Sequence, residues 1–315
     1  MTGAVLLTGG FGNVGGRFSS YLNKIGITDL KLATRRLQTP PSWAPDAQVK
    51  VCDLTNPESL KKACAGVDTI FHFAALNDRD CLQDPERAHQ INVVGTSNLV
   101  DAAVSCGVQH IVYMSTIHVY GAPLIGHFDE SSPTAPKHPY GLTHLDAERI
   151  LRHRSDDISS TIIRCGNGFG RPMSFDVDIW HILVNDLCVQ AVRDRQLVLK
   201  SPSNTRRNFV TLGDVCRALY FLGCESPISS GSDTFNLGSV KSRTLGEMAR
   251  LIAERSVKTL GIRPVIIESA KPTEEETSLE FDSSKLRDRG FLTEEKFELE
   301  IDGILDLVKR TYESN

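Results

Sequence analysis

The stretch LLTGGFGNVGG, residues 6–16, constrains the fold of this chain more than any other part of the sequence. A short apolar run at residues 4–8 ends at this glycine cluster, and a helical pattern, VGGRFSSYLNKIG, follows it at once. Glycines at such a junction permit a tight turn and let the backbone approach a pyrophosphate, whose charge lies at the helix N-terminus. The sequence therefore predicts a dinucleotide site, with Gly9, Gly12 and Gly15 in the turn.

The first half of the chain alternates short apolar runs with longer helical patterns. Continuous apolar runs of this length are typical of strands that are buried on both faces of a parallel sheet. The runs are AVLLT (4–8), LKLAT (30–34), QVKVCDL (48–54), DTIFHFAA (68–75), HIVYMST (110–116) and STIIRCG (160–166). Repeated strand–helix units predict an α/β fold with a doubly wound parallel sheet of the Rossmann type.

The second half of the chain is less regular. A helix is expected around residues 178–193, and TFNLG at residues 234–238 indicates a return to the sheet. We therefore expect a large domain and a smaller, discontinuous C-terminal one. The expected limits are residues 1–168 and 208–238 for a dinucleotide-binding domain, and residues 169–207 and 239–315 for a substrate-binding cap.

Composition excludes several classes of partner. A net charge of −4 gives no general attraction to nucleic acid or to an anionic membrane. No run approaches the ~18 apolar residues of a membrane span. The eight cysteines include no C-x-x-C pair, which is typical of reduced thiols rather than of a disulfide framework or a zinc site. We expect a cytoplasmic protein that binds neither nucleic acid nor membrane and holds no metal.

The residues after the second apolar run bear on which dinucleotide binds. NAD sites usually place an acidic residue there for the adenosine ribose 2′-hydroxyl, but this chain has Thr34, Arg35 and Arg36. Arginine offers a planar, bidentate partner to a 2′-phosphate, so the pattern favours NADP(H) over NAD(H). NAD(H) stays open, because two arginines after a strand can simply be solvated. Asp53, at the end of the third run, can accept from the adenine amino group or shape a turn.

Nine short segments form an ordered set along most of the chain. They are TGGFGNVG (8–15), CDL (52–54), FHFAA (71–75), INVVGTSNLV (91–100), MSTIHVYG (114–121), PYGLTH (139–144), RCGNGFGRP (164–172), RRNFVTLGDV (206–215) and FNLG (235–238). Together they resemble the extended short-chain dehydrogenase/reductases of the NAD(P)-dependent epimerase/dehydratase kind, which act mainly on nucleotide sugars. The set is specific for this superfamily and not for one substrate.

The resemblance implies roles for individual residues. Those implied to hold the dinucleotide are Gly9, Phe11, Gly12, Asn13, Val14 and Gly15 at the pyrophosphate, Asp53 and Leu54 at the adenine, and Ala74 at the ribose. Thr116 and Tyr140 match the catalytic Ser/Thr and Tyr, and the resemblance further implies that Thr116 binds the substrate and that Tyr140 contacts the dinucleotide, although Thr116 can also simply end a strand. Asn167 and Arg207 match positions that commonly contact a substrate diphosphate, although Asn167 can also cap a turn. Family members are commonly homodimers.

One departure from the family pattern concerns the Tyr-x-x-x-Lys motif, in which His144 takes the place of the lysine. The lysine normally holds the nicotinamide ribose hydroxyls and keeps a positive charge beside the phenol. A histidine, with a reference pKa near 6.5, is only partly charged at neutral pH and lowers the pKa of Tyr140 less. His144 is therefore expected to orient the ribose, while Tyr140 serves better as an acid than as a base.

We expect an NAD(P)-dependent oxidoreductase that transfers hydride at a sugar-like carbonyl or hydroxyl group, with reduction slightly favoured and a nucleotide sugar as substrate. Two alternatives stay open. One is a nucleotide-sugar 4-epimerase or dehydratase that keeps NAD bound through a transient 4-keto intermediate. The other is a cofactor-binding sensor or scaffold that has lost catalysis together with the lysine.

Overall fold

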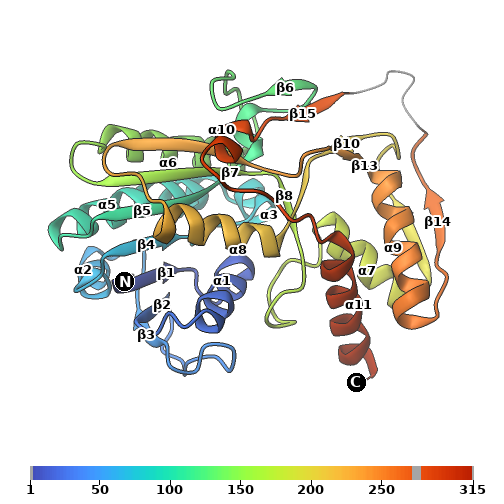
Figure 1. Ribbon diagram of the computed structural model, residues 1–315, viewed down its shortest axis with the longest axis horizontal. Helices are drawn as coiled ribbons and strands as arrows, with labels where there is room; N and C mark the ends of the chain where they lie inside the picture. Colours follow the sequence, from blue (N-terminus) through green and yellow to red (C-terminus); the bar gives the residue numbers. More distant parts are fainter. Residues whose placement is uncertain (1–2, 272–277, 314–315) are drawn as a thin grey trace. The chain divides into compact units, whose positions relative to one another are not determined.

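The computed structural model describes residues 3–271 and 278–313, and this part of the chain contains a seven-stranded sheet in the order β12–β7–β5–β4–β1–β2–β3 (Figure 1). The strands are β1 (Val5–Thr8), β2 (Leu30–Thr34), β3 (Gln48–Val51), β4 (Thr69–His72), β5 (His110–Thr116), β7 (Ser159–Cys165) and β12 (Ser232–Leu237). All pairings from β3 across to β7 are parallel. The predicted α/β fold of the Rossmann type is confirmed.

The strand order reverses between β1 and β4. The chain builds β2 and β3 on one side of β1 and then returns to add β4, β5 and β7 on the other side. In doubly wound sheets, ligands bind outside the carboxyl ends of the strands at such a reversal. The glycine turn that follows β1 therefore lies at the position where this fold class holds its ligands.

Helices cover both faces of the sheet. On one face lie α2 (Pro57–Cys64), α5 (Gly95–Ser105) and α6 (Pro139–His153), whose apolar residues share a core with Leu6 and Ile70. The other face receives α1 (Asn13–Lys24), where the Phe18 ring lies 4.6 Å from that of Phe71 between centroids. Ile70 and Phe71 are neighbours on β4, and their side chains lie on opposite faces of the sheet because successive strand side chains point in opposite directions.

The sheet belongs to the first of two compact units, which consists of residues 1–123, 130–165 and 216–236. Shorter elements of this unit are α3 (Asp78–Gln83), α4 (Pro85–Ala88), a π-helix (His89–Val94) and a 3₁₀-helix (Ile117–Tyr120). The helix α8 (Leu212–Tyr220) ends in this unit and continues into a second π-helix (Phe221–Glu225). The Tyr220 ring lies 6.0 Å from that of Tyr21 on α1, so this segment shares the face covered by α1.

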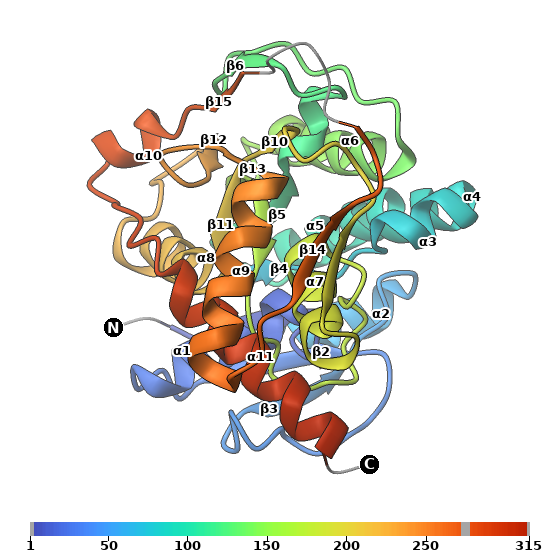
Figure 2. The ribbon, with the colours of Figure 1, turned by 90° about the vertical axis from the view of Figure 1, so that its right-hand side faces the viewer.

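The second unit consists of residues 124–129, 166–215 and 237–315. Its core lies between three helices that pack side by side, α7 (Leu183–Arg193), α9 (Leu245–Leu260) and α11 (Phe297–Glu313) (Figure 2). The remaining elements are the strand pairs β8 (Asn167–Phe169) with β11 (Phe209–Thr211), β9 (Gln196–Leu199) with β14 (Val265–Glu268), β6 (Gly126–Phe128) with β15 (Leu279–Phe281) and β10 (Arg206–Arg207) with β13 (Arg243–Thr244), and the helix α10 (Ser284–Asp288).

The expected helix around residues 178–193 begins at Leu183, and the expected strand at residues 234–238 is β12, which joins the main sheet. The domain limits that we expect from the sequence stay a prediction. None of the described helices combines the length and the apolar character that crossing a membrane requires.

Candidate active site and cofactor site

A cavity of about 230 Å³ lies at the carboxyl ends of the first four strands of the chain. Its wall comes from residues that end or follow β1 and β2, from residues that follow β3 and β4, and from the π-helix at residues 89–94. The lining residues are Thr8, Gly9, Phe11, Gly12, Ala33, Thr34, Arg35, Cys52, Asp53, Leu54, Ala74, Ala75, Leu76 and Ile91. The cavity thus coincides with the strand reversal that the fold class uses for ligands.

Part of the predicted cofactor set lines this cavity. The lining members are Gly9, Phe11, Gly12, Arg35, Asp53, Leu54 and Ala74. The members outside the lining are Asn13, Val14, Gly15, Arg36, Tyr140 and His144. Sequence reasoning missed Thr8, Ala33, Thr34, Cys52, Ala75, Leu76 and Ile91 as lining residues. All but Ile91 lie within two residues of the end of a predicted strand, so strand ends were the signal that could have found them.

The turn between β1 and α1 suits a negatively charged group. In the described structure α1 begins after Gly12 with no side chain capping its first turn and no acidic residue there. The N–H groups of such a helix end carry partial positive charge and are open to an anion. A Cβ atom on Gly15 would lie 2.2 Å from the carbonyl oxygen of Gly9, so only glycine lets the helix start this close to the strand. These features fit the pyrophosphate of a dinucleotide.

Two charged residues that the sequence indicated, Arg35 and Asp53, line the cavity. Arg35 and Arg36 are exposed, and Arg35 is the one that lines the cavity. The Oδ1 atom of Asp53 accepts hydrogen bonds from the backbone N–H and the hydroxyl of Thr55, each at 2.8 Å. These bonds, helped by the charge of Arg35, lower the pKa of Asp53. Asp53 is therefore an ionised acceptor that shapes a turn and also lines the cavity.

The end of β5 and the start of α6 bring Thr116 and Tyr140 together. Thr116 ends β5, and Tyr140 lies in the first turn of α6 after His138, whose Nδ1 accepts the Tyr140 backbone N–H at 3.2 Å. A Cβ atom on Gly141 would lie 2.7 Å from the carbonyl oxygen of His118, so glycine permits this close approach. The side chains of Thr116 and Tyr140 are hydrogen-bonded to each other.

The environment of Tyr140 keeps its phenol protonated. Burial raises the pKa of Tyr140 well above its usual value, and the negative charge of Asp78 raises it further, while the hydrogen bond with Thr116 acts in the opposite direction. Burial disfavours the charged form of any acid. At neutral pH Tyr140 is therefore a proton donor.

His144 lies one turn after Tyr140, with ring centroids 4.4 Å apart. Its Nδ1 atom is 2.8 Å from the Tyr113 hydroxyl oxygen, and its buried Nε2 atom has no hydrogen-bond partner among the described residues. Burial lowers the pKa of His144 to about 4, so the imidazole is neutral at pH 7. The positive charge that a lysine would place beside the phenol is absent from this position.

Asn92, which sequence reasoning did not single out, connects the cavity wall to α6. Its Oδ1 atom accepts the Leu76 backbone N–H at 2.8 Å, and its Nδ2 atom donates to the Thr143 hydroxyl at 3.1 Å. Leu76 lines the cavity, and Thr143 precedes His144. An asparagine inside the apolar run INVV was the signal that could have indicated a buried polar contact.

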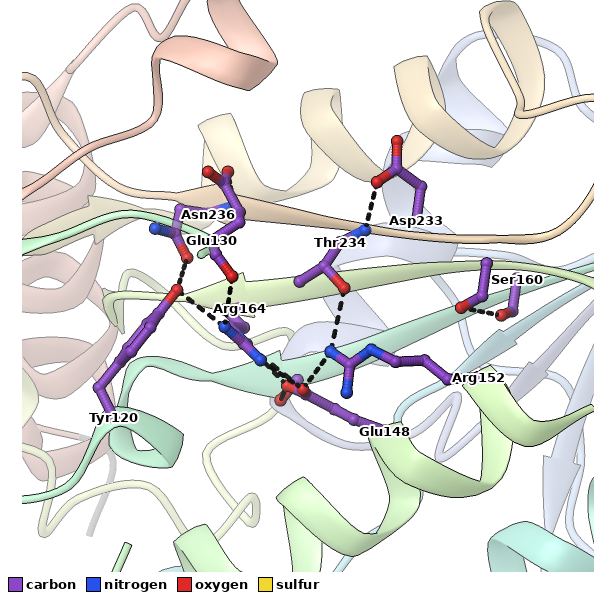
Figure 3. Close-up of polar contacts among 11 residues, drawn as sticks. Tyr120, Glu130, Glu148, Arg152, Ser160, Arg164, Asp233, Thr234 and Asn236 are labelled. Carbon is purple, nitrogen blue, oxygen red and sulfur yellow. Dashed lines mark hydrogen bonds and ion pairs between the residues drawn. The ribbon is translucent and has the colours of Figure 1, made fainter. Parts of the chain in front are cut away.

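A buried ion pair joins β7 to α6 (Figure 3). The Nη2 atom of Arg164 lies 2.8 Å from Oε2 of Glu148, and the two side chains are 4% and 0% exposed. Glu148 also accepts a hydrogen bond from the Ser115 hydroxyl at 2.6 Å and one from Arg152 at 2.7 Å. Since Ser115 precedes Thr116, the ion pair holds β5, β7 and α6 together close to the candidate catalytic residues.

The same network continues from Arg164 to β12 (Figure 3). Arg164 donates to the Tyr120 hydroxyl oxygen at 3.0 Å, and that hydroxyl donates to Oδ1 of Asn236 at 2.7 Å. Burial alone raises the pKa of Glu148, but the hydrogen bonds and positive charge of Arg164 bring it below its usual value. Glu148 is therefore ionised at neutral pH although it is fully buried.

The second unit contains the two residues expected to contact a substrate diphosphate. The Asn167 side-chain amide donates to the carbonyl oxygen of Asn208 at 3.0 Å, which supports the pairing of β8 with β11. Arg207 on β10 is half-buried, and burial lowers its pKa. Within the described residues, no carboxylate pairs with its guanidinium. A half-buried cation without a counter-ion is suited to bind an anion.

Comparison with known proteins adds independent findings. Residues 5–238 match the family model described as the NAD dependent epimerase/dehydratase family. The low-salt glycan biosynthesis protein Agl12 of Haloferax volcanii is 27% identical over 245 residues, which cover 75% of this chain and 76% of that protein. A putative UDP-glucose 4-epimerase of Methanocaldococcus jannaschii is 25% identical over 260 residues, covering 79% and 81%.

A solved structure shows the same fold. The Thermus thermophilus UDP-glucose 4-epimerase in complex with NAD matches with a TM-score of 0.80 and 21% identity, covering 97% of this chain and 99% of that one. The resemblance that the ordered sequence segments indicated is confirmed by the family match.

Proposed function

Because the chain belongs to the NAD dependent epimerase/dehydratase family, we propose that it is an NAD(P)-dependent oxidoreductase acting on a carbonyl or hydroxyl group of a nucleotide sugar. The observation that carries the proposal is the hydrogen-bonded pair of Thr116 and Tyr140. This pair lies in the same unit as a glycine turn and a cavity that fit a dinucleotide. A protonated phenol is what the reduction of a carbonyl group requires.

The residues divide the chemistry between them. A bound nicotinamide dinucleotide supplies or accepts the hydride. Tyr140 gives its phenolic proton to the substrate oxygen during reduction and takes a proton back during oxidation, while the Thr116 hydroxyl binds the same oxygen and orients it. Since the pKa of Tyr140 is raised and His144 is neutral, the phenol holds its proton firmly. The proposed site is therefore a better reductase than oxidant at neutral pH.

A nucleotide-sugar 4-epimerase is the second candidate, and the similarity to proteins named as UDP-glucose 4-epimerases favours it. Mass spectrometry of the dinucleotide released from freshly purified protein distinguishes the two. The reductase is supported if the released dinucleotide is NADPH that exchanges with solution, and if NADPH is oxidised when a keto-sugar nucleotide is added. Retained NAD, with interconversion of the two 4-epimers and no net change in nicotinamide absorbance, supports the epimerase. A protein that binds dinucleotide but catalyses neither reaction is a sensor or scaffold.

Arg35→Ala is expected to weaken NADPH binding and to leave NADH binding nearly unchanged. Arg35 lines the cavity just after β2, where a guanidinium would pair with the 2′-phosphate that only NADPH carries. Loss of such a charge-assisted bond costs roughly 1.5–3 kcal/mol, or about tenfold to a hundredfold in affinity. Calorimetric titration measures both affinities, with Arg36→Ala as the matched control outside the cavity lining. Wild-type protein that binds NADH as tightly as NADPH would contradict the preference.

Arg207→Ala is expected to weaken the binding of a UDP-sugar by roughly 1.5–3 kcal/mol, because the diphosphate would lose a charge-assisted partner. The matched control is Arg206→Ala on the same strand, whose guanidinium donates to the carbonyl oxygen of Ser242 at 3.3 Å. Titration with UDP-glucose measures the effect. If wild-type protein binds no UDP-sugar, or if Arg207→Ala binds it equally well, a smaller carbonyl compound becomes the leading substrate.

A further inference from the structure

Tyr113 and His144 form a buried pair next to Tyr140. The Tyr113 hydroxyl oxygen lies 2.8 Å from Nδ1 of His144, and the two residues are 2% and 3% exposed. Because Nδ1 is engaged, Nε2 is the nitrogen that remains for a bound group. Whether Nε2 can donate a hydrogen bond depends on which ring nitrogen carries the proton.

Two proton arrangements fit the distance, and they differ in the number of buried groups that they leave unsatisfied. If Tyr113 donates to Nδ1, the imidazole proton is on Nε2, and this N–H is the one group without a partner. If Nδ1–H donates to the phenol oxygen instead, the Tyr113 O–H and the Nε2 lone pair both lack a partner among the described residues. Each unsatisfied buried polar group costs free energy, so the first arrangement is favoured.

His72 provides a comparison within the same unit. Its Nδ1 atom lies 2.7 Å from the Thr8 hydroxyl and its Nε2 atom 3.0 Å from the Thr96 hydroxyl. The Thr96 hydroxyl donates to the carbonyl oxygen of Asn92 at 2.6 Å, so it accepts from Nε2–H of His72. Both ring nitrogens of His72 are thus satisfied by the chain itself. His144 has the same arrangement at Nδ1, but its Nε2 atom has no partner among the described residues.

We propose that Tyr113 is a positioning residue that holds His144 in the tautomer protonated at Nε2, so that this N–H donates to the bound dinucleotide beside Tyr140. The inference rests on the proposed function, because it requires a dinucleotide hydroxyl group at this position. A lysine ammonium is a donor only. Of the two neutral tautomers of His144, the one protonated at Nε2 is the one that presents a donor there.

Nitrogen NMR of labelled protein without added dinucleotide, at neutral pH, reads the tautomer directly. The His144 signals are identified by their loss in His144→Gln. In wild type we expect Nε2 protonated and Nδ1 unprotonated, and in Tyr113→Phe we expect both tautomers to be populated. Tyr120→Phe is the matched control, since it also removes a buried phenol hydroxyl, one that bonds Asn236 instead. Unchanged His72 signals report an intact fold.

Two NMR outcomes overturn the proposal. One is a wild-type protein in which His144 is protonated at Nδ1. This outcome contradicts the proposal even if Tyr113→Phe does not fold. The other is a folded Tyr113→Phe in which the His144 tautomer is unchanged. Neither measurement involves catalysis, so an inactive protein contradicts the proposed function without deciding the tautomer.

Dinucleotide affinity tests whether Tyr113 acts through His144. Tyr113→Phe is expected to weaken binding about fivefold to tenfold in the wild-type background, the effect of one lost neutral hydrogen bond. In the His144→Gln background the same change is expected to alter affinity less than about twofold, because residues that act as a unit are not additive. An equal loss in both backgrounds would show a merely structural effect of Tyr113 and overturn the proposal.

Discussion

Tyr140→Phe is expected to abolish hydride transfer in both directions, lowering the single-turnover rate by roughly 10²–10⁴-fold, the range of one positioned acid or base. The variant keeps the ring but has no phenolic proton to give or to regain. Nicotinamide absorbance follows the reaction. Dinucleotide binding, measured separately, distinguishes a lost proton transfer from a lost cofactor. Full activity of this variant would remove Tyr140 from the mechanism.

The pH dependence of both directions tests why the phenol stays protonated. Since burial raises the pKa of Tyr140, oxidation is expected to be slow at pH 7 and to speed up as pH rises toward that pKa, while reduction stays constant. His144→Lys adds a permanent charge beside the phenol and lowers its pKa, so oxidation is expected to speed up at lower pH. Identical profiles for wild type and His144→Lys would refute the charge argument even if Tyr140 is the acid.

Glu148→Gln is expected to destabilise the folded protein by roughly 3–5 kcal/mol at neutral pH, because it leaves the Arg164 guanidinium buried without a counter-charge. Urea unfolding of wild type and variant measures the difference in free energy of unfolding. The matched control is Asp101→Asn, which removes the ion pair with Arg154 at a carboxylate that is 60% exposed. An exposed pair contributes about 0–1 kcal/mol. Equal effects of the two substitutions would show that the buried pair contributes no more than a surface one.

Acid is expected to remove the difference in free energy of unfolding between wild type and Glu148→Gln. The pKa of Glu148 is lower in the folded chain than its usual value of 4.5, so its contribution to stability is complete above the unfolded pKa. That contribution is lost as pH falls through the folded pKa. Unfolding midpoints of both proteins at several pH values test whether the contribution of Glu148 is lost in acid. A difference that stays constant into acid would mean that the carboxylate charge is not what stabilises the fold.

The sequence by itself determined the fold class and the site of the glycine turn. Both depend on local properties, since an apolar run, a glycine or a helix cap acts on residues next to it in the chain. The runs at residues 30–34 and 110–116 coincide with β2 and β5. The run at residues 48–54 is longer than β3, which ends at Val51. The Cys52 N–H still bonds the carbonyl oxygen of Thr34 at 2.8 Å, and the chain then turns at Asp53, whose carboxylate accepts hydrogen bonds from Thr55.

The protonation states and the partners of the candidate catalytic residues were decided only by the tertiary structure. Nothing in the spacing of Tyr113 and His144 shows that they meet, because their contact requires α6 to pack against β5. The reference pKa of histidine predicts a partly charged side chain at neutral pH, but burial lowers the pKa of His144 to about 4. Removal from water depends on every element around the group, so it is a property of the packed chain and is not encoded in any one stretch of sequence.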